Sequence, residues 1–185
     1  HRFSDALAFG LAAHASARDA RETEIALAII VDACIETGRY EAAAETLETL
    51  VDAHPGLAAL ARLSYMRELH GDVAGALEAM RGAAAAGADA REIAWCRVKI
   101  AELALVDGDT TAAKSAVGLA LFADPSAVEA LALLGRLDAS RGEWEAAITR
   151  YRHVLELYRD SGVFIALGEA LEASGDARAA GVSYD

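Results

Sequence analysis

Apolar and polar residues alternate along this chain with the spacing of helices, and one arrangement of them returns at a regular interval. It is clearest from Gly142 to Arg159, where a glycine and a charged residue precede a run of apolar positions separated by three, one, three, three and one residues. That spacing places the apolar side chains on one face of a helix. The positions are Trp144, Ala147, Ile148, Tyr151, Val154 and Leu155. The pattern predicts an amphipathic helix that buries one face against neighbours.

The arrangement recurs around five glycines, at intervals of 33, 37, 34 and 33 residues. These are Gly38, Gly71, Gly108, Gly142 and Gly175. An alanine follows each glycine by five residues: Ala43, Ala76, Ala113, Ala147 and Ala180. A branched aliphatic residue precedes each by eight: Ile30, Leu63, Ile100, Leu134 and Leu167. A period of about 34 residues predicts stacked helix pairs, with glycine in the turn where a Cβ would be strained.

We therefore expect one array over residues 1–185: a half unit 1–18, full units 21–55, 56–89, 90–126 and 127–160, and a truncated unit 161–185. The expected helices are 1–17, 21–37, 40–53, 57–70, 73–86, 90–106, 110–122, 127–141, 144–159 and 162–174. Asp19 with Glu22, and Asp89 with Glu92, have the spacing of a capping box. The extra residues at 86–89 make the longest interval, and we expect a kink there.

Several of these positions together resemble the tetratricopeptide repeat. They are Leu134, Gly135, Trp144, Ala147 and Tyr151, with Pro55 and Pro125 at the ends of units. The resemblance covers nearly the whole chain and implies an all-α fold, a right-handed superhelical solenoid of antiparallel helix pairs. Arg97 departs from the family pattern, which has a large apolar residue there, and Arg67 and Asp138 stand where it prefers tyrosine.

In proteins of this family the first helix of each pair lines a concave groove, so the resemblance implies a peptide-binding face here. A second stripe on the expected first helices supplies the candidates Asp32, Tyr65, Trp95, Val98, Glu102 and Arg136, and flanking positions add Arg62 and Lys99. Aromatic and cationic side chains dominate binding energy at interfaces. Tyr65 and Trp95 lie on adjacent first helices, and we expect them to line one pocket. The alternative is that Trp95 only covers the longer connection and that the charged residues are only solvated.

Family members that clamp a C-terminal carboxylate carry lysine and asparagine at defined groove positions. Here Ala28, Asp32 and Trp95 stand at such places, Arg62 replaces an expected asparagine, and only Lys99 fits. An aspartate would repel a carboxylate. We therefore expect a groove that is not of the carboxylate-clamp type.

Charge and composition narrow the classes of function. The net charge is −12, and the only lysines are Lys99 and Lys114, so nucleic acid is not an expected partner. No apolar run approaches ~18 residues, so we expect no membrane span. Cys34 and Cys96 are expected to be buried thiols, and the five histidines show no ligand spacing. No phosphate loop or nucleophile motif is present in the sequence, so we expect no enzyme, no cofactor and no metal.

The function that this sequence favours is a protein-interaction scaffold that binds a peptide segment or partner protein. The alternative is a structural, assembly or regulatory module of a larger parent protein, with no dissociable ligand. The chain begins at His1 and no leader follows, so we expect a segment of a longer protein and take the cytoplasm as the default location. Because the last unit is truncated, we expect Ile165, Leu167 and Leu171 to be partly exposed and self-association through this end.

Overall fold

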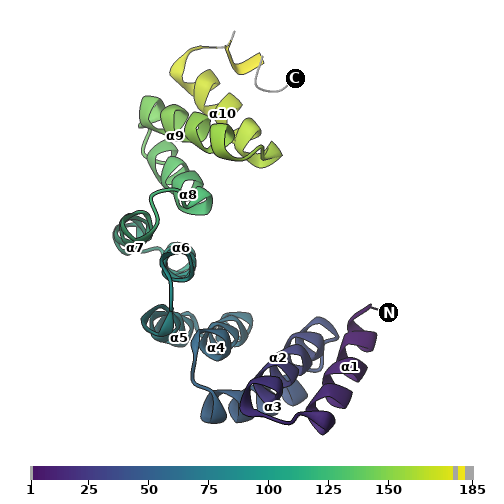
Figure 1. The fold of residues 1–185 in the computed structure, drawn as a ribbon. Helices are drawn as coiled ribbons and strands as arrows, with labels where there is room; N and C mark the ends of the chain where they lie inside the picture. The colour runs from purple at the N-terminus through teal and green to yellow at the C-terminus, as the bar shows by residue number, and fades with distance from the viewer. Residues whose placement is uncertain (1, 177–178, 182–185) are drawn as a thin grey trace. The chain divides into compact units, whose positions relative to one another are not determined.

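The structure is a computed structural model that describes residues 2–176 and 179–181. No strand occurs among these residues, and besides three helical residues at 179–181 they contain ten α-helices (Figure 1). They are α1 (Arg2–Ser16), α2 (Ala20–Glu36), α3 (Tyr40–Ala53), α4 (Leu57–Leu69), α5 (Val73–Ala86), α6 (Ala90–Val106), α7 (Thr110–Ala123), α8 (Val128–Ala139), α9 (Trp144–Leu157) and α10 (Ser161–Ser174). Part of the last predicted unit, at 177–178 and 182–185, lies outside the described residues.

The chain divides into two compact units, residues up to Gly87 and residues from Ala88 onward. The first unit contains α1 to α5, and the second contains α6 to α10. Within each unit, helices that follow one another in sequence pack against one another. The division falls at the longer connection that the sequence placed at 86–89. The predicted fold class, all-α with paired helices in a repeat array, is confirmed.

The repeat positions have the backbone and burial that the pattern predicted. The five turn glycines have positive φ angles, from 72° at Gly38 to 95° at Gly175. These values lie in the left-handed region, which opposes a Cβ. The alanines five residues later are at most 1 % exposed. A side chain of this size lets the two helices of a pair approach closely, so the register of the repeat is confirmed.

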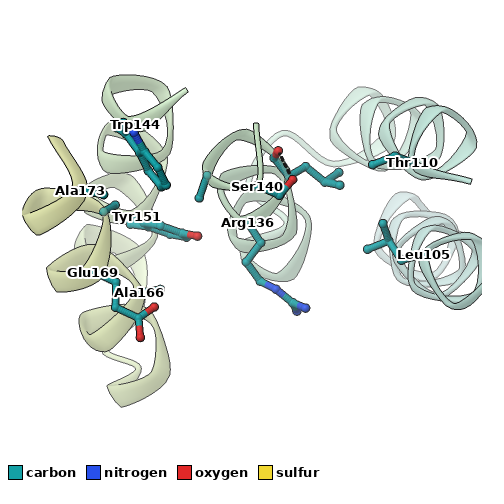
Figure 2. A pocket seen from close by; sticks show the side chains of 12 residues that line it. Leu105, Thr110, Arg136, Ser140, Trp144, Tyr151, Ala166, Glu169 and Ala173 are labelled. Atoms are coloured by element: carbon teal, nitrogen blue, oxygen red, sulfur yellow. Dashed lines mark hydrogen bonds between the residues drawn. The ribbon is translucent and has the colours of Figure 1, made fainter. Parts of the chain in front are cut away.

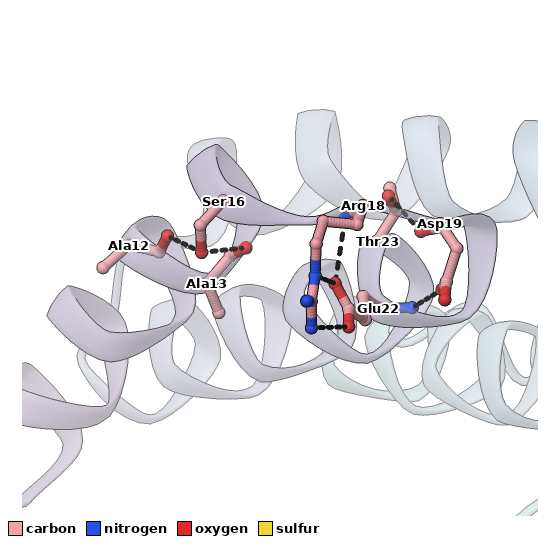
Figure 3. Close-up of polar contacts among 7 residues, drawn as sticks. All are labelled: Ala12, Ala13, Ser16, Arg18, Asp19, Glu22 and Thr23. Carbon is pink, nitrogen blue, oxygen red and sulfur yellow. Dashed lines mark hydrogen bonds and ion pairs between the residues drawn. The ribbon is translucent and has the colours of Figure 1, made fainter.

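Two helices begin with an aspartate that accepts a backbone hydrogen bond from the glutamate three residues on. Glu22 N donates to Asp19 Oδ1 at 2.8 Å, and Glu92 N donates to Asp89 Oδ1 at 2.9 Å. Each glutamate side chain in turn accepts from the backbone N–H just before the cap: Arg18 N for Glu22 (Figure 3) and Ala88 N for Glu92. The predicted caps are confirmed, and their return bonds fall one residue earlier than in the standard box.

The predicted helix ends were wrong at two places in the second unit. Helix α8 runs from Val128 to Ala139 rather than over 127–141, and α9 ends at Leu157 rather than at Arg159. The reason at α9 is the backbone of Tyr158, which is extended with φ −150° and ψ 130°. Tyr158 consequently lies outside the helix, next to the exposed Leu157 that ends it.

The expectation that the last helix exposes its apolar face was wrong for two of three residues. Leu167 and Leu171 are 6 % and 3 % exposed, whereas Ile165 is 53 % exposed. The two leucines pack in one cluster with Ala147, Ile148 and Tyr151 of α9. Ala180 also belongs to that cluster, so the chain beyond α10 helps to cover this face. Self-association through this end remains a prediction, and less apolar surface is exposed there than the sequence predicted.

Cys34 and Cys96 are both buried free thiols, as the sequence predicted. Burial, and to a smaller extent the negative charge of Glu92, raises the pKa of Cys96 to about 11. Its thiolate is therefore scarce near neutral pH.

Candidate functional site

In the first unit, two predicted groove residues form a bidentate ion pair that joins α2 to α4. Arg62 Nε donates to Asp32 Oδ1 at 2.8 Å, and Arg62 Nη2 donates to Asp32 Oδ2 at 2.7 Å. Arg62 also donates through Nη1 to the carbonyl of Ala58 at 2.9 Å. The two charges therefore neutralise each other, and Arg62 is held in one orientation.

Tyr65 lies on the same helix as Arg62, three residues further on. Its side chain is 45 % exposed, and no hydrogen bond to its hydroxyl occurs within the residues that the structure describes. An aromatic ring with a free hydroxyl is suited to contacts with both apolar and polar groups of a partner.

In the second unit, Trp95 lines a pocket of about 620 Å³ at one end of the helices. The start of α6, the connection from α7 to α8 and the end of α9 form its walls. Trp95 is 44 % exposed and Tyr158 is 61 % exposed, whereas Val98 is only 4 % exposed and lies in the core beneath them. Val98 was predicted as a groove residue, and its burial leaves it little surface to offer a ligand.

Sequence reasoning missed Leu157 and Tyr158 as neighbours of Trp95. Tyr158 was assigned to a helix that was expected to continue to residue 159, and Leu157, the last residue of α9, lies off the predicted apolar stripe. A usable signal for Tyr158 was present, because it lies two residues before the capping residue Asp160 and outside the apolar stripe of α9.

Charged groups around the Trp95 pocket are Arg91, Asp124 and Glu129. Hydrogen bonds from the hydroxyl and the backbone N–H of Ser126 lower the pKa of Asp124. Asp124 Oδ1 accepts both, at 2.7 Å and 2.9 Å. Asp124 is therefore ionised at neutral pH, and the pocket carries two carboxylates against one guanidinium.

Two further predicted residues, Lys99 and Glu102, pair with each other along α6. Lys99 Nζ lies 2.7 Å from Glu102 Oε2, with both side chains close to half exposed. A pair of this kind contributes about 0.3–0.5 kcal/mol to a helix. Both groups are accessible to a partner, but each already has a counter-charge.

Arg136 lines a different pocket of the second unit, also of about 620 Å³, formed by residues of α6 to α10 (Figure 2). The lining is mostly apolar, and its polar groups include Arg136, Tyr151 and Glu169. Trp144, expected to be buried, is only partly so and also lines this pocket. The sequence had assigned Tyr151 to the core and had not selected Glu169.

The predicted residues thus fall into separate groups. Asp32 and Arg62 are joined, Lys99 and Glu102 are joined, and Trp95 and Val98 share a pocket. Arg136 is in another pocket of the same unit. Tyr65 belongs to the first unit and Trp95 to the second, so their sharing of one pocket remains a prediction.

The remaining features concern metal binding and membrane insertion. Among the described side chains, no group of three or more His, Cys, Asp or Glu residues is arranged to hold a metal ion. None of the helices in this part of the chain combines the length and the apolar character needed to cross a membrane.

Comparison with known proteins identifies the class of fold. No protein-family model matches the sequence, and no curated protein matches it either. Solved structures do match. BtubC from P. vanneervenii has a TM-score of 0.83 at 16% identity, with coverage of 99% of this chain and 88% of that one.

A tetratricopeptide repeat protein from Parabacteroides merdae has a TM-score of 0.71 at 14% identity, over 98% of this chain and 70% of that one. Cut9, in the APC/C hetero-tetramer Cut9–Hcn1, has a TM-score of 0.79 at 12% identity, over 98% of this chain and 35% of that one. The chain is an all-α helical-repeat protein. Its fold is that of the tetratricopeptide repeat, as the sequence predicted.

Proposed function

We propose that this chain is a protein-interaction scaffold, and that it binds a segment of a partner protein through the first helices of its pairs. These are α2, α4, α6, α8 and α10 in the observed numbering. The groove is not of the carboxylate-clamp type, because Asp32 stands where a cation would be needed and is already paired with Arg62.

The observation that carries this proposal is the exposure of aromatic side chains on first helices. Tyr65 and Trp95 are each nearly half exposed. Trp95 also borders a pocket of a size that suits a ligand, within the usual range of roughly 300–1,000 Å³. Burying an aromatic ring removes a large apolar area from water at little entropic cost, so such residues are energetic centres of interfaces.

One fold neighbour supports the same class of function. Cut9 was solved in a hetero-tetramer with Hcn1, so this arrangement of helices accommodates a protein partner in at least that case. Likeness in fold does not fix a function. The second candidate is a structural or regulatory module of a larger protein, favoured by the exposed Ile165 at the end of the array.

The test is an unbiased selection of displayed peptides on the wild-type protein, followed by binding measurements with Trp95→Ala and Tyr65→Ala. Loss of a well-packed aromatic anchor costs about 2 kcal/mol or more at an interface. We expect Trp95→Ala to weaken the selected peptides by about thirtyfold, since 1.4 kcal/mol corresponds to a factor of ten. Leu119→Ala, which removes an exposed apolar residue from the second helix α7, is the control.

Two results would overturn the proposal. One is that selection yields no peptide whose binding saturates. The other is that both aromatic variants bind every selected peptide as the wild type does, with helical content unchanged. In either case the structural or regulatory module becomes the better account.

A further inference from the structure

The pocket around Arg136 contains three polar groups that no other part of the described chain satisfies. Arg136 on α8 and Glu169 on α10 are exposed, and neither forms an ion pair or a side-chain hydrogen bond within the described residues. Tyr151 on α9 is only 2 % exposed, yet its hydroxyl also lacks a partner there. Figure 2 shows the tyrosine ring with its oxygen directed toward the helix that carries Arg136.

The position of Tyr151 follows from a glycine in α8. A Cβ on Gly135 would lie 2.7 Å from Cε1 of the tyrosine ring, so only glycine lets the ring pass close to the α8 backbone. The ring thereby becomes part of the pocket wall, next to apolar groups such as Leu137 and Ala170. Its hydroxyl oxygen is not one of the buried unpartnered atoms, so it opens into the pocket, where it is available to hydrogen-bond a ligand.

The charges on either side of the hydroxyl act on it with opposite signs. Burial raises the pKa of Tyr151, Arg136 lowers it, and Glu169 and Asp138 raise it. Arg136 and Glu169 line the same pocket as Tyr151, and they do not pair with each other. The pocket presents an apolar floor between a free cation on one helix and a free carboxylate on another.

We propose that this pocket, as one subsite of the interaction scaffold proposed above and resting on that proposal, receives an apolar side chain from a partner segment that carries an acidic residue on one side of it and a basic residue on the other. The acidic residue pairs with Arg136 and the basic residue with Glu169. The Tyr151 hydroxyl donates a hydrogen bond to a backbone carbonyl of the segment. Because the two charges come from different helices, they fix the direction in which the segment lies.

The charges of the partner segment follow from those of Arg136 and Glu169, which have opposite signs. A segment of one sign of charge would satisfy one rim group and be repelled by the other, whereas opposite charges satisfy both. An uncharged apolar segment would fill the apolar floor of the pocket. It would also displace water from Arg136 and Glu169 without offering them an opposite charge, and this loss of hydration costs free energy.

The experiment uses short fluorescein-labelled peptides with a central leucine, an acidic residue on one side and a basic residue on the other, made in both orders. Companion peptides carry two acidic residues, two basic residues, or serine in place of leucine. Binding to the purified protein is measured by fluorescence anisotropy. We expect one order to bind about three- to tenfold more tightly than the other and than the like-charged peptides. The serine peptide should lose about tenfold or more, since a buried leucine is worth that much.

The decisive variant exchanges the two charges, Arg136→Glu together with Glu169→Arg. It should reverse the preference between the two peptide orders, which a merely structural role of these residues would not do. Tyr151→Phe should weaken the preferred peptide by about two- to tenfold through loss of one hydrogen bond. The control is the same exchange on the outer face of α9, Arg152→Glu with Glu156→Arg, where both residues are exposed. It should leave the order of preference as in the wild type.

The inference is overturned if no peptide of the series binds, if both orders bind alike, or if the charge exchange leaves the preference unchanged. Peptides from the unbiased selection separate this failure from failure of the scaffold itself. If those peptides depend on Trp95 but not on Arg136, Tyr151 or Glu169, the scaffold stands and this subsite is wrong.

Discussion

At the scale of single residues, two of the three positions that depart from the family pattern, Arg67 and Asp138, are compensated by partners on the second helix of the same pair. Arg67 replaces a tyrosine, and its guanidinium donates to the carbonyl of Gly75 at 2.9 Å. Asp138 stands at the same place in a later pair, is 2 % exposed, and has Arg150 Nη1 at 2.8 Å from its Oδ2. The angles of this last contact do not make a hydrogen bond, so it is a buried ion pair held mainly by charge. Removing one partner of such a pair leaves the other uncompensated.

Replacement of Arg150 by methionine tests this compensation. The change keeps most of the apolar stem and removes the charge beside Asp138, so the free energy of unfolding should fall by about 1–3 kcal/mol. Arg152→Met on the same helix is the control, because Arg152 is exposed and has no partner in the described structure. Urea unfolding of the three proteins gives the comparison. Equal loss in both variants would show that the pair does not support Asp138.

Ala147 tests the register of the repeat. It is fully buried where α9 packs on its neighbours, and a leucine there would overfill the site. We expect Ala147→Leu to lower the free energy of unfolding by about 1–3 kcal/mol. Glu45→Ala, at an exposed position of α3, should change it by less than about 0.5 kcal/mol. If neither variant changed the free energy of unfolding, Ala147 would not set the spacing between the helices.

Cys96 gives a dependence of stability on pH. Its pKa is raised from 9.0 to about 11, so between these values the folded chain holds the thiol proton more tightly than the unfolded chain does. This contribution is fully present below pH 9 and is lost as the pH rises toward 11. Urea unfolding of the wild type should therefore show a steeper loss of stability across this window than Cys96→Ala. If the stability of the wild type and of Cys96→Ala fell equally with pH across this window, the raised pKa of Cys96 would be contradicted.

At the scale of helices, each element begins and ends for local reasons that the sequence contains. Apolar spacing located all ten helices to within two residues at both ends, because one buried stripe is enough to define an amphipathic helix. Helix α9 ends two residues earlier than expected, at Leu157, because the backbone of Tyr158 is extended. A stripe pattern predicts which residues face a neighbouring helix, and it says little about residues that leave the helix.

The cap at Asp89 is expected to contribute to the stability of α6. Its carboxylate satisfies the N–H of Glu92, which otherwise has no partner inside the helix. Asp89→Ala should lower the free energy of unfolding by about 0.5–2 kcal/mol. Asp52→Ala, in the last turn of α3, should have little effect or a slight stabilising one, since a carboxylate there opposes the helix dipole. A larger loss for Asp52→Ala than for Asp89→Ala would be incompatible with this account.

At the scale of the whole molecule, two compact units built from one repeat carry separate groups of candidate binding residues. The fold was predictable because five copies of one pattern reinforce each other. The site was predictable only in part. Exposure of Tyr65 and Trp95 followed from their place on the second stripe, whereas the pocket around Arg136 depends on Gly135, Tyr151 and Glu169 coming from three elements. No spacing within one helix contains that information.

The central claim is that a partner segment binds the first helices of the pairs. Amide chemical shifts, recorded by NMR while a peptide from the unbiased selection is added, test it directly. The account predicts that the largest shift changes fall on α2, α4, α6, α8 and α10, with the indole N–H of Trp95 among them. Changes confined to the second helices α3, α5, α7 and α9, or no change at a saturating peptide concentration, would contradict it.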